Sequence, residues 1–497
     1  MKYSFISAEE AAASIHNGNT IGIGGFSSVG TPKAVPAALA VYAEKLHSEG
    51  KEFKVGLITG GATGSQVDSA LAQAHAVAFR TPFQSNKEMR NAINAGEVQY
   101  YDVHLSQIGQ DVRYGFLGDI DVAIVEASDI TEEGDIVLST SVGISPTLIQ
   151  VAHKVIIELN EAHASKLTGM HDIYIPDAPP YRREIPIYRV NDRAGSISVR
   201  VNPEKVVGVV CTNERDRIAA FTPLNDTTSR IGQNVADFLL GEYQRGAIPR
   251  EFLPLQSGVG NIANAVLGAL GADKKLPAFS MYTEVIQNSV IDLMMQERIR
   301  FVAGSSLTLS DDRLDMLYDN IDVMKERVLL RPQEITNHPE MIRRLGIIAV
   351  NTALEADIFG NVNSTHVLGS KMMNGIGGSA DFARNAYLSI FTTPSTAKDG
   401  LISSIVPHVS HVDSTEHDVR ILVTEQGVAD LRGKSPSQRA RCIIENCAHP
   451  DYKELLWDYL KLSEGKGCHT PMSLRNALKM HIAFAETGDM RNTKFEM

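Results

Sequence analysis

Residues 126–143 read EASDITEEGDIVLSTSVG, and residues 355–369 read EADIFGNVNSTHVLG. Both stretches run through an acid, Ala, Asp-Ile, a Gly, branched apolar residues, Ser-Thr and a final Gly, with small gaps between these positions. Each follows a β-rich run. We interpret the likeness as a trace of internal duplication. Because the period is too long for a solenoid, the sequence predicts two similar domains in tandem.

Alternating strands, glycine turns and helices indicate the fold class of both halves. TIGIGGF (20–26) and KVGLITGGATG (54–64) are β-rich runs that end in glycines, and PLQSGVGNIANAVLGAL (254–270) continues from such a turn into a helix. This alternation is typical of α/β proteins. The sequence therefore predicts two α/β domains, residues 1–212 and 213–497, which meet near the polar segment CTNERDR.

Composition and charge indicate which compartment and which partners the protein is expected to have. The chain has 497 residues, a net charge of −12 and four cysteines. The acidic balance argues against nucleic acid as a partner, and the sparse cysteines fit a reducing compartment. The N-terminus lacks a signal-peptide pattern, and no apolar run approaches the roughly 20 residues of a membrane helix. These features predict a soluble cytoplasmic protein without a membrane partner.

The common cofactor and metal motifs do not occur in this sequence. The glycine turns match neither the dinucleotide fingerprint nor the P-loop, which disfavours redox and ATP chemistry. HVSHVD (408–413) and the region around Cys447 and His469 contain metal-binding residue types without metal-site spacing. No metal is predicted, and a metal-dependent hydrolase is a disfavoured alternative. No GxSxG elbow supports a serine hydrolase.

One carboxylate stands out in AFSMYTEVIQNSV (278–290). Glu284 sits where a strand is expected to end and a helix to begin. Helix capping is the simplest explanation, because negative charge is favourable near a helix N-terminus. A carboxylate at the ligand end of an α/β domain can also be a nucleophile, with backbone N–H groups of glycine turns stabilising an oxyanion. Glu425, in VTEQG, occupies a similar place.

Long motifs give the chain a family resemblance. The motifs PLQSGVGNIANAV, MYTEVIQ, NVNSTHVLGSKMMNGIGGSADFARNAYLSIF, PSTAK and VTEQGVADLRG occur in this order, and the likeness extends over nearly the whole chain, from GGF near Gly24 to the C-terminal CAHPDY. Together they resemble the acetyl-CoA hydrolase/transferase family, which includes succinyl-CoA:acetate and propionyl-CoA:succinate CoA-transferases. The resemblance implies two tandem CoA-transferase domains, CoA as a substrate with no permanently bound cofactor, small carboxylic acids as partners, and a homodimer.

The resemblance also implies residue roles. Glu284 would attack an acyl-CoA and pass through an acyl-glutamyl anhydride to a glutamyl-CoA thioester, and Asn337 would support it by hydrogen bonding. The backbone N–H groups of Val259 and Gly378 would stabilise the oxyanion. Arg217 and Glu425 would serve the substrate carboxylate, with Glu425 either orienting Arg217 or standing protonated. The implied CoA contacts are Gly258, Val259, Gly260, Asn261, Ile262, Leu354, Asn374, Gly378 and Lys398.

Three functions remain to be compared. CoA transfer and acetyl-CoA hydrolysis differ only in whether water reaches the glutamyl intermediate, and transfer is favoured because a covalent glutamate is a roundabout route to hydrolysis. A non-catalytic CoA or sugar-phosphate binding protein on the same fold would not need Glu284. The sequence does not identify the acyl donor and acceptor.

Overall fold

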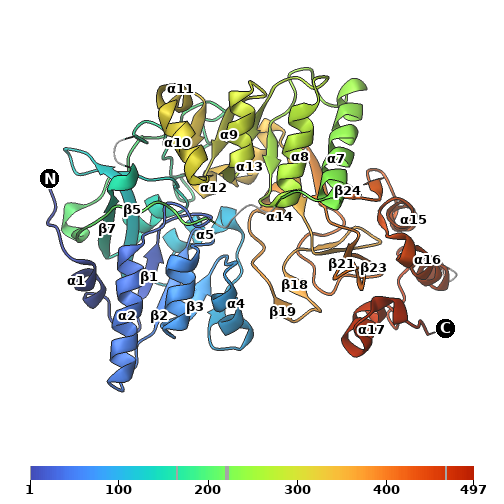
Figure 1. The fold of residues 1–497 in the computed structure, drawn as a ribbon, viewed down its shortest axis with the longest axis horizontal. Helices are drawn as coiled ribbons and strands as arrows, with labels where there is room; N and C mark the ends of the chain where they lie inside the picture. Colours follow the sequence, from blue (N-terminus) through green and yellow to red (C-terminus); the bar gives the residue numbers. More distant parts are fainter. Residues whose placement is uncertain (1, 164–165, 219–222, 465–466, 497) are drawn as a thin grey trace. The chain divides into compact units, whose positions relative to one another are not determined.

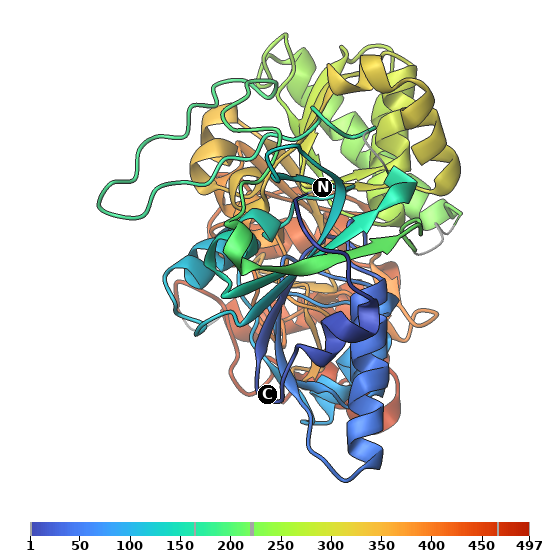
Figure 2. The same ribbon diagram turned by 90° about the vertical axis from the view of Figure 1, so that its left-hand side faces the viewer.

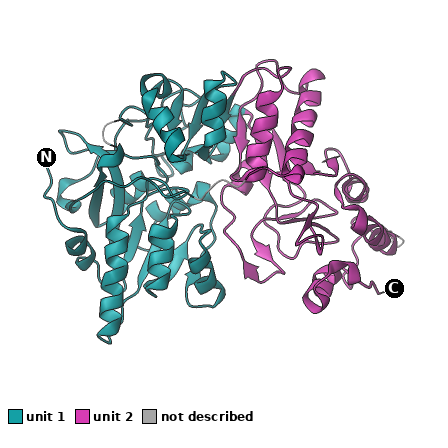
Figure 3. Cartoon of the chain, viewed as in Figure 1, with its two compact units in different colours: residues 1–220, 280–345 teal, residues 221–279, 346–497 magenta. Residues whose placement is uncertain are grey.

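The chain folds into two compact units. The computed structural model describes residues 2–163, 166–218, 223–464 and 467–496. Unit 1 comprises residues 1–220 and 280–345, and unit 2 comprises residues 221–279 and 346–497 (Figure 3). Residues 280–345 are grouped with the N-terminal part in this division, and the predicted domains 1–212 and 213–497 stay a prediction. The predicted α/β class is confirmed, since both units are built on parallel strands covered by helices.

A mostly parallel sheet forms the centre of unit 1. Its strands lie in the order β4-β3-β2-β1-β5-β7-β8, all parallel, with β6 antiparallel on β5. Because the strand order changes direction at β1, loops at the carboxyl ends of β1 and β5 occupy the usual ligand position of an open α/β sheet. The strands are β1 (Thr20–Ile23), β2 (Val55–Thr59), β3 (Val77–Thr81), β4 (Gln99–Tyr100), β5 (Val122–Ile130), β6 (Ile136–Leu138), β7 (Lys154–Asn160) and β8 (Val206–Thr212).

Helices cover this sheet through an apolar core. Val35 and Leu39 of α2 are fully buried in one cluster with Ile21, Leu57 and Ile124 of the strands, and Figure 1 shows α2 running alongside β1 and β2. Burial of such side chains drives the packing. The helices are α1 (Ala8–Ala13), α2 (Ala34–Ser48), α3 (Ala70–Gln73), α4 (Lys87–Asn94), α5 (Leu105–Arg113) and α6 (Ser145–Val151).

Residues 280–345 complete unit 1. Hydrogen bonds attach this segment to the loop after β6: Leu307 N–H donates to the Thr140 carbonyl at 2.8 Å, and Val142 N–H donates to the Ser305 carbonyl at 2.9 Å. This backbone pairing explains why the segment belongs to unit 1. Its elements are β10 (Phe279–Tyr282), β11 (Val285–Gln287), α9 (Asn288–Met295), β12 (Ile299–Gly304), β13 (Ser306–Thr308), α10 (Asp311–Asp319), α11 (Ile321–Lys325), β14 (Val328–Leu330), α12 (Gln333–Thr336) and α13 (Pro339–Leu345).

Unit 2 contains a second parallel set of strands. β9, β15, β20 and β24 lie side by side and parallel, and β25 adds an antiparallel edge. Phe391 and Leu422 are buried in one cluster with Ile443 and Tyr452 of the C-terminal helices. The main elements are α7 (Asp226–Gln244), β9 (Leu255–Ser257), α8 (Asn261–Ala272), β15 (Ile348–Thr352), β20 (Leu388–Thr392), β24 (Ile421–Thr424), β25 (Gly427–Asp430), α15 (Pro436–Cys447), α16 (Pro450–Glu464) and α17 (Lys479–Thr487).

Shorter elements of unit 2 surround these strands. They are β16 (Glu355–Asp357), β17 (Val362–Asn363), β18 (His366–Val367), β19 (Lys371–Met372), α14 (Ser379–Asn385), β21 (Thr396–Ala397), β22 (Ile402–Ser403) and β23 (Ile405–Val406). Most of them form two-stranded or three-stranded sheets in the loops between the long strands. These loops contain four of the nine residues that the sequence analysis assigned to CoA, Leu354, Asn374, Gly378 and Lys398.

The internal duplication is visible in the structure. The strand order β1-β5-β7-β8 is repeated as β9-β15-β20-β24, and β4-β3-β2 is repeated as β14-β12-β10. Corresponding turns make the same backbone bond: Gly24 N–H donates to Ile124 at 2.9 Å, and Gly258 N–H donates to Val350 at 3.0 Å. In both quoted repeats a buried glutamate, Glu126 or Glu355, stands on a strand that pairs with an antiparallel return strand.

An irregular segment leaves unit 1 between the isolated bridges at residues 173 and 196. Residues 174–195 form neither helix nor strand, and Figure 2 shows a loop of this region projecting from the unit. The segment is held by the fully buried Arg331, whose Nη2 donates to the Val190 carbonyl at 3.2 Å and to the Asp192 carbonyl. None of the helices in the described part of the chain combines the length and apolar character that a membrane span requires.

Acid is expected to destabilise unit 1 through His171. This side chain is fully buried, its Nε2 lies 3.0 Å from the Ser139 carbonyl, and burial lowers its pKa to about 4. The unfolded chain therefore takes up a proton near the ordinary pKa of about 6.5, and the folded chain resists it, so stability is lost as the pH falls from 6.5 to 4. His171→Gln preserves an amide donor to Ser139 and removes this titration.

The measurement is the apparent Tm of the wild type and of His171→Gln between pH 7.5 and 4.5. The stability advantage of the wild type should shrink as the pH falls, by up to about 3 kcal/mol across the full window. A difference in Tm that stays constant with pH would show that His171 does not titrate in this way.

Candidate active site

Glu284 lies at a bend between two strands of unit 1. β10 ends at Tyr282 and β11 begins at Val285, so the glutamate follows the carboxyl end of β10. Its carbonyl accepts hydrogen bonds from the N–H groups of Ser305 and Ser306 at 2.7 and 3.1 Å. The side chain is half-buried. The backbone that carries the carboxylate is therefore fixed on both sides.

The expected strand-to-helix junction at Glu284 is wrong. α9 begins at Asn288, and Gln287 is its N-cap residue. Residues 285–287, between Glu284 and α9, pair with Ser306–Thr308 as parallel strands. Because these residues are extended, the helix cannot begin before Asn288. Neither capping nor the helix dipole accounts for Glu284, because both effects are confined to the first turn of a helix.

Asn337 holds the Glu284 carboxylate. Its Nδ2 donates to Oε1 of Glu284 at 2.6 Å, the contact that the sequence analysis expected of this residue. Asn337 is fully buried, and its Oδ1 accepts from the hydroxyl of Thr336 at 2.8 Å. With its oxygen occupied in this way, the amide presents its N–H₂ group to the glutamate.

The short helix α12 that precedes Asn337 is anchored in turn. Arg113 of α5 donates two hydrogen bonds to Glu334, at 2.7 and 2.6 Å, and Gln333 N–H donates to the Gly143 carbonyl at 3.1 Å. Such a bidentate arginine–carboxylate pair is both strong and directional. The chain thus supports the Glu284–Asn337 contact with a second layer of buried polar contacts.

Four assigned residues or motifs gather at one edge of unit 2. Val259 follows β9, Leu354 follows β15, PSTAK follows β20, and Glu425 follows β24. These strands are adjacent and parallel, so their carboxyl ends lie at the same edge of the sheet. Ligands of α/β proteins bind at this edge. The structure therefore brings these sequence-predicted positions together.

The glycine turn after β9 is open. Val259 exposes 57% of its surface, and Leu354 exposes 39%. Gly260 has a φ of +110°, which favours glycine, and it directly precedes α8, which begins with Asn261 and Ile262. Gly258 and Gly260, on either side of Val259, are partly exposed.

The turn that contains Asn374 and Gly378 leads into α14. Gly378 is buried and has a φ of −95°, whereas Gly377 has a φ of +62°. The left-handed conformation that requires glycine is therefore at position 377. Asn374 is half-buried at a bend between β19 and this turn.

Lys398 and Glu425 differ in their environments. Lys398 is exposed at a hairpin tip with a φ of +49°, and its ammonium lies 5.0 Å from the centre of the Phe484 ring. Glu425 accepts hydrogen bonds from the backbone N–H of Ser395 at 2.8 Å and from its hydroxyl. Burial acts to raise the pKa of Glu425, but the bonds from Ser395 outweigh it and the net pKa is lowered. The two expected roles of Glu425, orienting Arg217 or standing protonated beside an anionic substrate, stay predictions.

Arg217 is exposed in unit 1. It pairs with Glu214 of the same segment at 3.1 Å. The expected pairing of Arg217 with Glu425 stays a prediction. The histidines of HVSHVD have ordinary partners: His411 lies 3.3 Å from Asp413, and Nδ1 of His408 lies 2.9 Å from the Val409 carbonyl.

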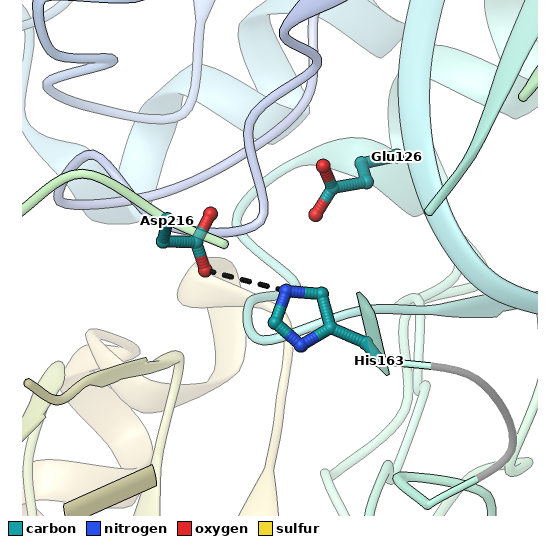
Figure 4. A group of neighbouring side chains, drawn as sticks. All are labelled: Glu126, His163 and Asp216. Carbon is teal, nitrogen blue, oxygen red and sulfur yellow. Dashed lines mark ion pairs between the residues drawn. The ribbon is translucent and has the colours of Figure 1, made fainter. Parts of the chain in front are cut away.

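Sequence reasoning missed a buried charged cluster in unit 1. Among the described residues, one group of His, Cys, Asp or Glu has its ligand atoms close enough to hold a metal: Glu126, His163 and Asp216 (Figure 4). Lys33 joins them, with its ammonium 3.0 Å from Asp216 and in contact with Glu126. Only Glu126, the first acid of the repeat, could have been singled out from the sequence. Lys33, His163 and Asp216 come from distant segments, so no local pattern connects them.

Solved structures share the fold. RipA from Yersinia pestis superposes with a TM-score of 0.70 at 22% identity, over 92% of this chain and 97% of that chain. 4-Hydroxybutyrate CoA-transferase from Porphyromonas gingivalis superposes with a TM-score of 0.63 at 23% identity, over 92% and 97% of the two chains. At these identities the likeness establishes the α/β fold and nothing more.

Sequence comparisons establish the family. The acetyl-CoA hydrolase/transferase N-terminal domain matches residues 2–211, and the C-terminal domain of that family matches residues 314–460. Succinyl-CoA:acetate CoA-transferase of Clostridium kluyveri is 48% identical, over 98% of this chain and 90% of that protein. Propanoyl-CoA:succinate CoA transferase of Escherichia coli is 47% identical, over 98% and 99%. Acetyl-CoA hydrolase of Saccharomyces cerevisiae is 44% identical, over 98% and 95%.

The chain therefore belongs to the acetyl-CoA hydrolase/transferase family. Its relatives are enzymes that act on CoA thioesters, and they include both transferases and hydrolases. The predicted family, fold class and enzymatic character are confirmed. The predicted cytoplasmic location and homodimer stay predictions.

Proposed function

We propose that this enzyme moves CoA from a small acyl-CoA to a small carboxylate, with Glu284 as the covalent nucleophile. The observation that carries the proposal is the half-buried Glu284 carboxylate, fixed through its own carbonyl and held by Asn337 at 2.6 Å. A carboxylate fixed in this way at the end of a β-strand has lost the rotational freedom that would otherwise oppose attack.

The first half of the reaction charges Glu284 with CoA. A carboxylate oxygen of Glu284 attacks the thioester carbon, the C–S bond breaks, and CoA leaves as a thiolate. The thiolate then attacks the glutamyl carbonyl of the mixed anhydride and expels the donor carboxylate, which takes the bridging oxygen with it. The product is a glutamyl-CoA thioester, which retains the free energy of the original thioester.

The second half transfers CoA to the acceptor. The acceptor carboxylate attacks the glutamyl carbonyl and releases CoA thiolate, and the thiolate then attacks the acceptor carbonyl of the new anhydride. Glu284 regains a free carboxylate that holds one oxygen atom from the acceptor. No proton is consumed or released in these steps.

Other residues take roles that the family resemblance suggests. The backbone N–H groups of Val259 and Gly378 would stabilise the tetrahedral oxyanions. Residues 258–262, Leu354, Asn374, Gly378 and Lys398 would bind CoA, in which the lysine serves as a point charge for phosphate. Arg217 would bind the acceptor carboxylate through its planar fork. Their positions at strand ends and in open turns support this assignment.

Hydrolysis of acetyl-CoA is the second candidate. The relatives of Schizosaccharomyces pombe and Saccharomyces cerevisiae, 46% and 44% identical, are named acetyl-CoA hydrolases. In that reaction water would attack the glutamyl-CoA thioester in place of a carboxylate. Because a transferase must exclude water while this thioester exists, the two functions differ in access to Glu284 and not in its chemistry.

Isotope transfer to Glu284 tests the proposal. A single turnover with acyl-CoA and an acceptor carboxylate labelled with ¹⁸O, in ordinary water, should raise the mass of the peptide that contains Glu284 by about 2 Da. The measurement is mass spectrometry of the digested enzyme. A turnover in H₂¹⁸O without an acceptor labels the same peptide if the enzyme hydrolyses the thioester.

Two controls make the result decisive. Unlabelled peptides from elsewhere in the chain should keep their mass, and enzyme incubated with the labelled carboxylate but no acyl-CoA should show no change. An unlabelled Glu284 peptide after turnover under both conditions would mean that the glutamate forms no covalent intermediate.

A further inference from the structure

Asp216 is held by a buried cluster that the proposed reaction does not yet use. Figure 4 shows its carboxylate facing His163, with Glu126 nearby. Asp216 Oδ1 lies 3.0 Å from the Lys33 ammonium and accepts the N–H of Gly30 at 3.0 Å. Its Oδ2 accepts the hydroxyl of Thr140. Three donors from two segments, the loop before α2 and the loop after β6, therefore converge on one side chain.

The segment that contains Asp216 is also attached at Glu214, whereas Arg217 is exposed. Asn160 fixes Glu214 by two hydrogen bonds, from Nδ2 to the Glu214 carbonyl at 2.6 Å and from the Glu214 N–H to Oδ1 at 3.2 Å. Arg217, directly after Asp216, is exposed. An irregular segment that ends in an exposed arginine is thus fastened to the protein interior at two of the three preceding positions.

The cation of this cluster is Lys33 and not a metal. Its ammonium is almost completely buried between Glu126 and Asp216, which outweigh burial and raise the pKa of Lys33. Burial lowers the pKa of His163 to about 4, so its imidazole is neutral. The lysine already supplies the positive charge that carboxylates would otherwise require from a metal.

The loop after β6 contacts both Asp216 and the strand that supports the backbone of Glu284. Thr140 donates its hydroxyl to Asp216, and its carbonyl accepts the N–H of Leu307 at 2.8 Å. Leu307 belongs to β13, whose Ser306 N–H donates to the carbonyl of Glu284 at 3.1 Å. One short run of hydrogen bonds therefore connects the segment of Arg217 with the segment of the proposed nucleophile.

A role in stability alone explains this arrangement poorly. Buried ion pairs contribute little net stability, because desolvation offsets their attraction, and apolar residues often replace them without loss. They do fix one geometry, since each partner must remain in place to compensate the other. The cluster fastens the one segment that presents Arg217.

We propose that Lys33 and Asp216 are positioning residues that fix Arg217 and so set the affinity for the acceptor carboxylate. This inference rests on the proposed function, in which Arg217 binds that carboxylate. Lys33 and Asp216 touch neither substrate nor reacting atoms. They act by limiting the orientations that the Arg217 guanidinium can take, which lowers the entropy lost when a carboxylate binds.

A double-mutant cycle tests the proposal on the full-length enzyme. Asp216→Asn retains the shape of the side chain and removes its charge, and it should raise KM for the acceptor carboxylate by about 10-fold with KM for acyl-CoA changed less than about 2-fold. Arg217→Gln should raise the acceptor KM at least as much. In the Arg217→Gln background, Asp216→Asn should add less than about 2-fold, because its effect passes through the arginine.

Matched variants separate this role from general stability. Asp315→Asn removes an exposed carboxylate that pairs with Arg215, a residue of the same segment as Asp216 and Arg217. This change should leave both KM values within about 2-fold of the wild type, because exposed ion pairs contribute little free energy. If Asp216→Asn does not fold, Thr140→Val removes a single hydrogen bond to Asp216 and should raise the acceptor KM alone, by about 3-fold.

Each outcome has one meaning. If Arg217→Gln raises the acceptor KM but Asp216→Asn and Thr140→Val do not, the positioning role is wrong and the proposed function stands. If Arg217→Gln leaves that KM unchanged, the acceptor role of Arg217 is wrong, and the inference fails with it. Fully additive effects in the cycle would show that Asp216 acts independently of the arginine.

Discussion

Glutamine in place of Glu284 is expected to lower kcat for CoA transfer by at least about 10³-fold, because an uncharged amide cannot attack the thioester. The substitution preserves the surroundings: the amide oxygen can still accept the hydrogen bond that Asn337 donates at 2.6 Å, and the Glu284 carbonyl remains bonded to Ser305 and Ser306. Transfer is measured as acceptor-dependent formation of the new acyl-CoA.

The fold must stay intact for this result to be informative. The Tm of Glu284→Gln should stay within a few degrees of the wild type. Glu297→Gln is a matched control, because Glu297 is an exposed glutamate whose partner is Arg327, and it should retain full activity. Transfer at the wild-type rate by pure Glu284→Gln would rule out the covalent mechanism.

Alanine in place of Asn337 is expected to lower kcat by about 10²-fold, the usual cost of removing one well-placed donor from an active site. Without the amide, the Glu284 carboxylate loses the hydrogen bond from Asn337, and the hydroxyl of Thr336 keeps only the Gln333 carbonyl as an acceptor. Because Asn337 contacts the Glu284 carboxylate and is not among the residues proposed to bind CoA, KM for acyl-CoA should change much less than kcat.

Steady-state kinetics with saturating acceptor distinguishes these effects. Asn94→Ala is a suitable control, because Asn94 is exposed in the last turn of α4, with Nδ2 bonded to the Arg90 carbonyl at 3.0 Å. An unchanged kcat in Asn337→Ala would show that the hydrogen bond to Glu284 is incidental. A large rise in KM for acyl-CoA would instead show that Asn337 binds the substrate and does not orient the nucleophile.

Local patterns in the sequence were sufficient to predict the strand–turn–helix units. The turns after β9, β15, β20 and β24 were recognisable as strand ends, and parallel pairing brings strand ends to one edge. The repeat around Glu126 and Glu355 predicted two related halves, and the strand order of the sheets bears this out. The contact between Asn337 and Glu284 was expected only from the family resemblance, because the two residues are far apart in the chain.

Other features depend on pairing that no local pattern encodes. EVIQ after Thr283 has the composition of a helix start, yet its hydrogen bonds go to Ser306–Thr308, and the helix begins later. Residues 280–345 join unit 1 through backbone hydrogen bonds to residues 140–143. No sequence pattern in either stretch predicts this pairing. The cluster around Asp216 collects Lys33, Glu126 and His163 from four separate segments.

The division of unit 1 into two stretches affects the order in which it can form during synthesis. Its first 220 residues leave the ribosome before residues 280–345, with part of unit 2 between them. The N–H of Val142 and the carbonyl of Thr140 must therefore wait for Ser305 and Leu307, which complete their pairing. The strands on either side of Glu284 do not belong to the sheet formed by β1–β8. The reactive carboxylate gains its supporting contacts from Ser305, Ser306 and Asn337 only after residue 337 has been synthesised.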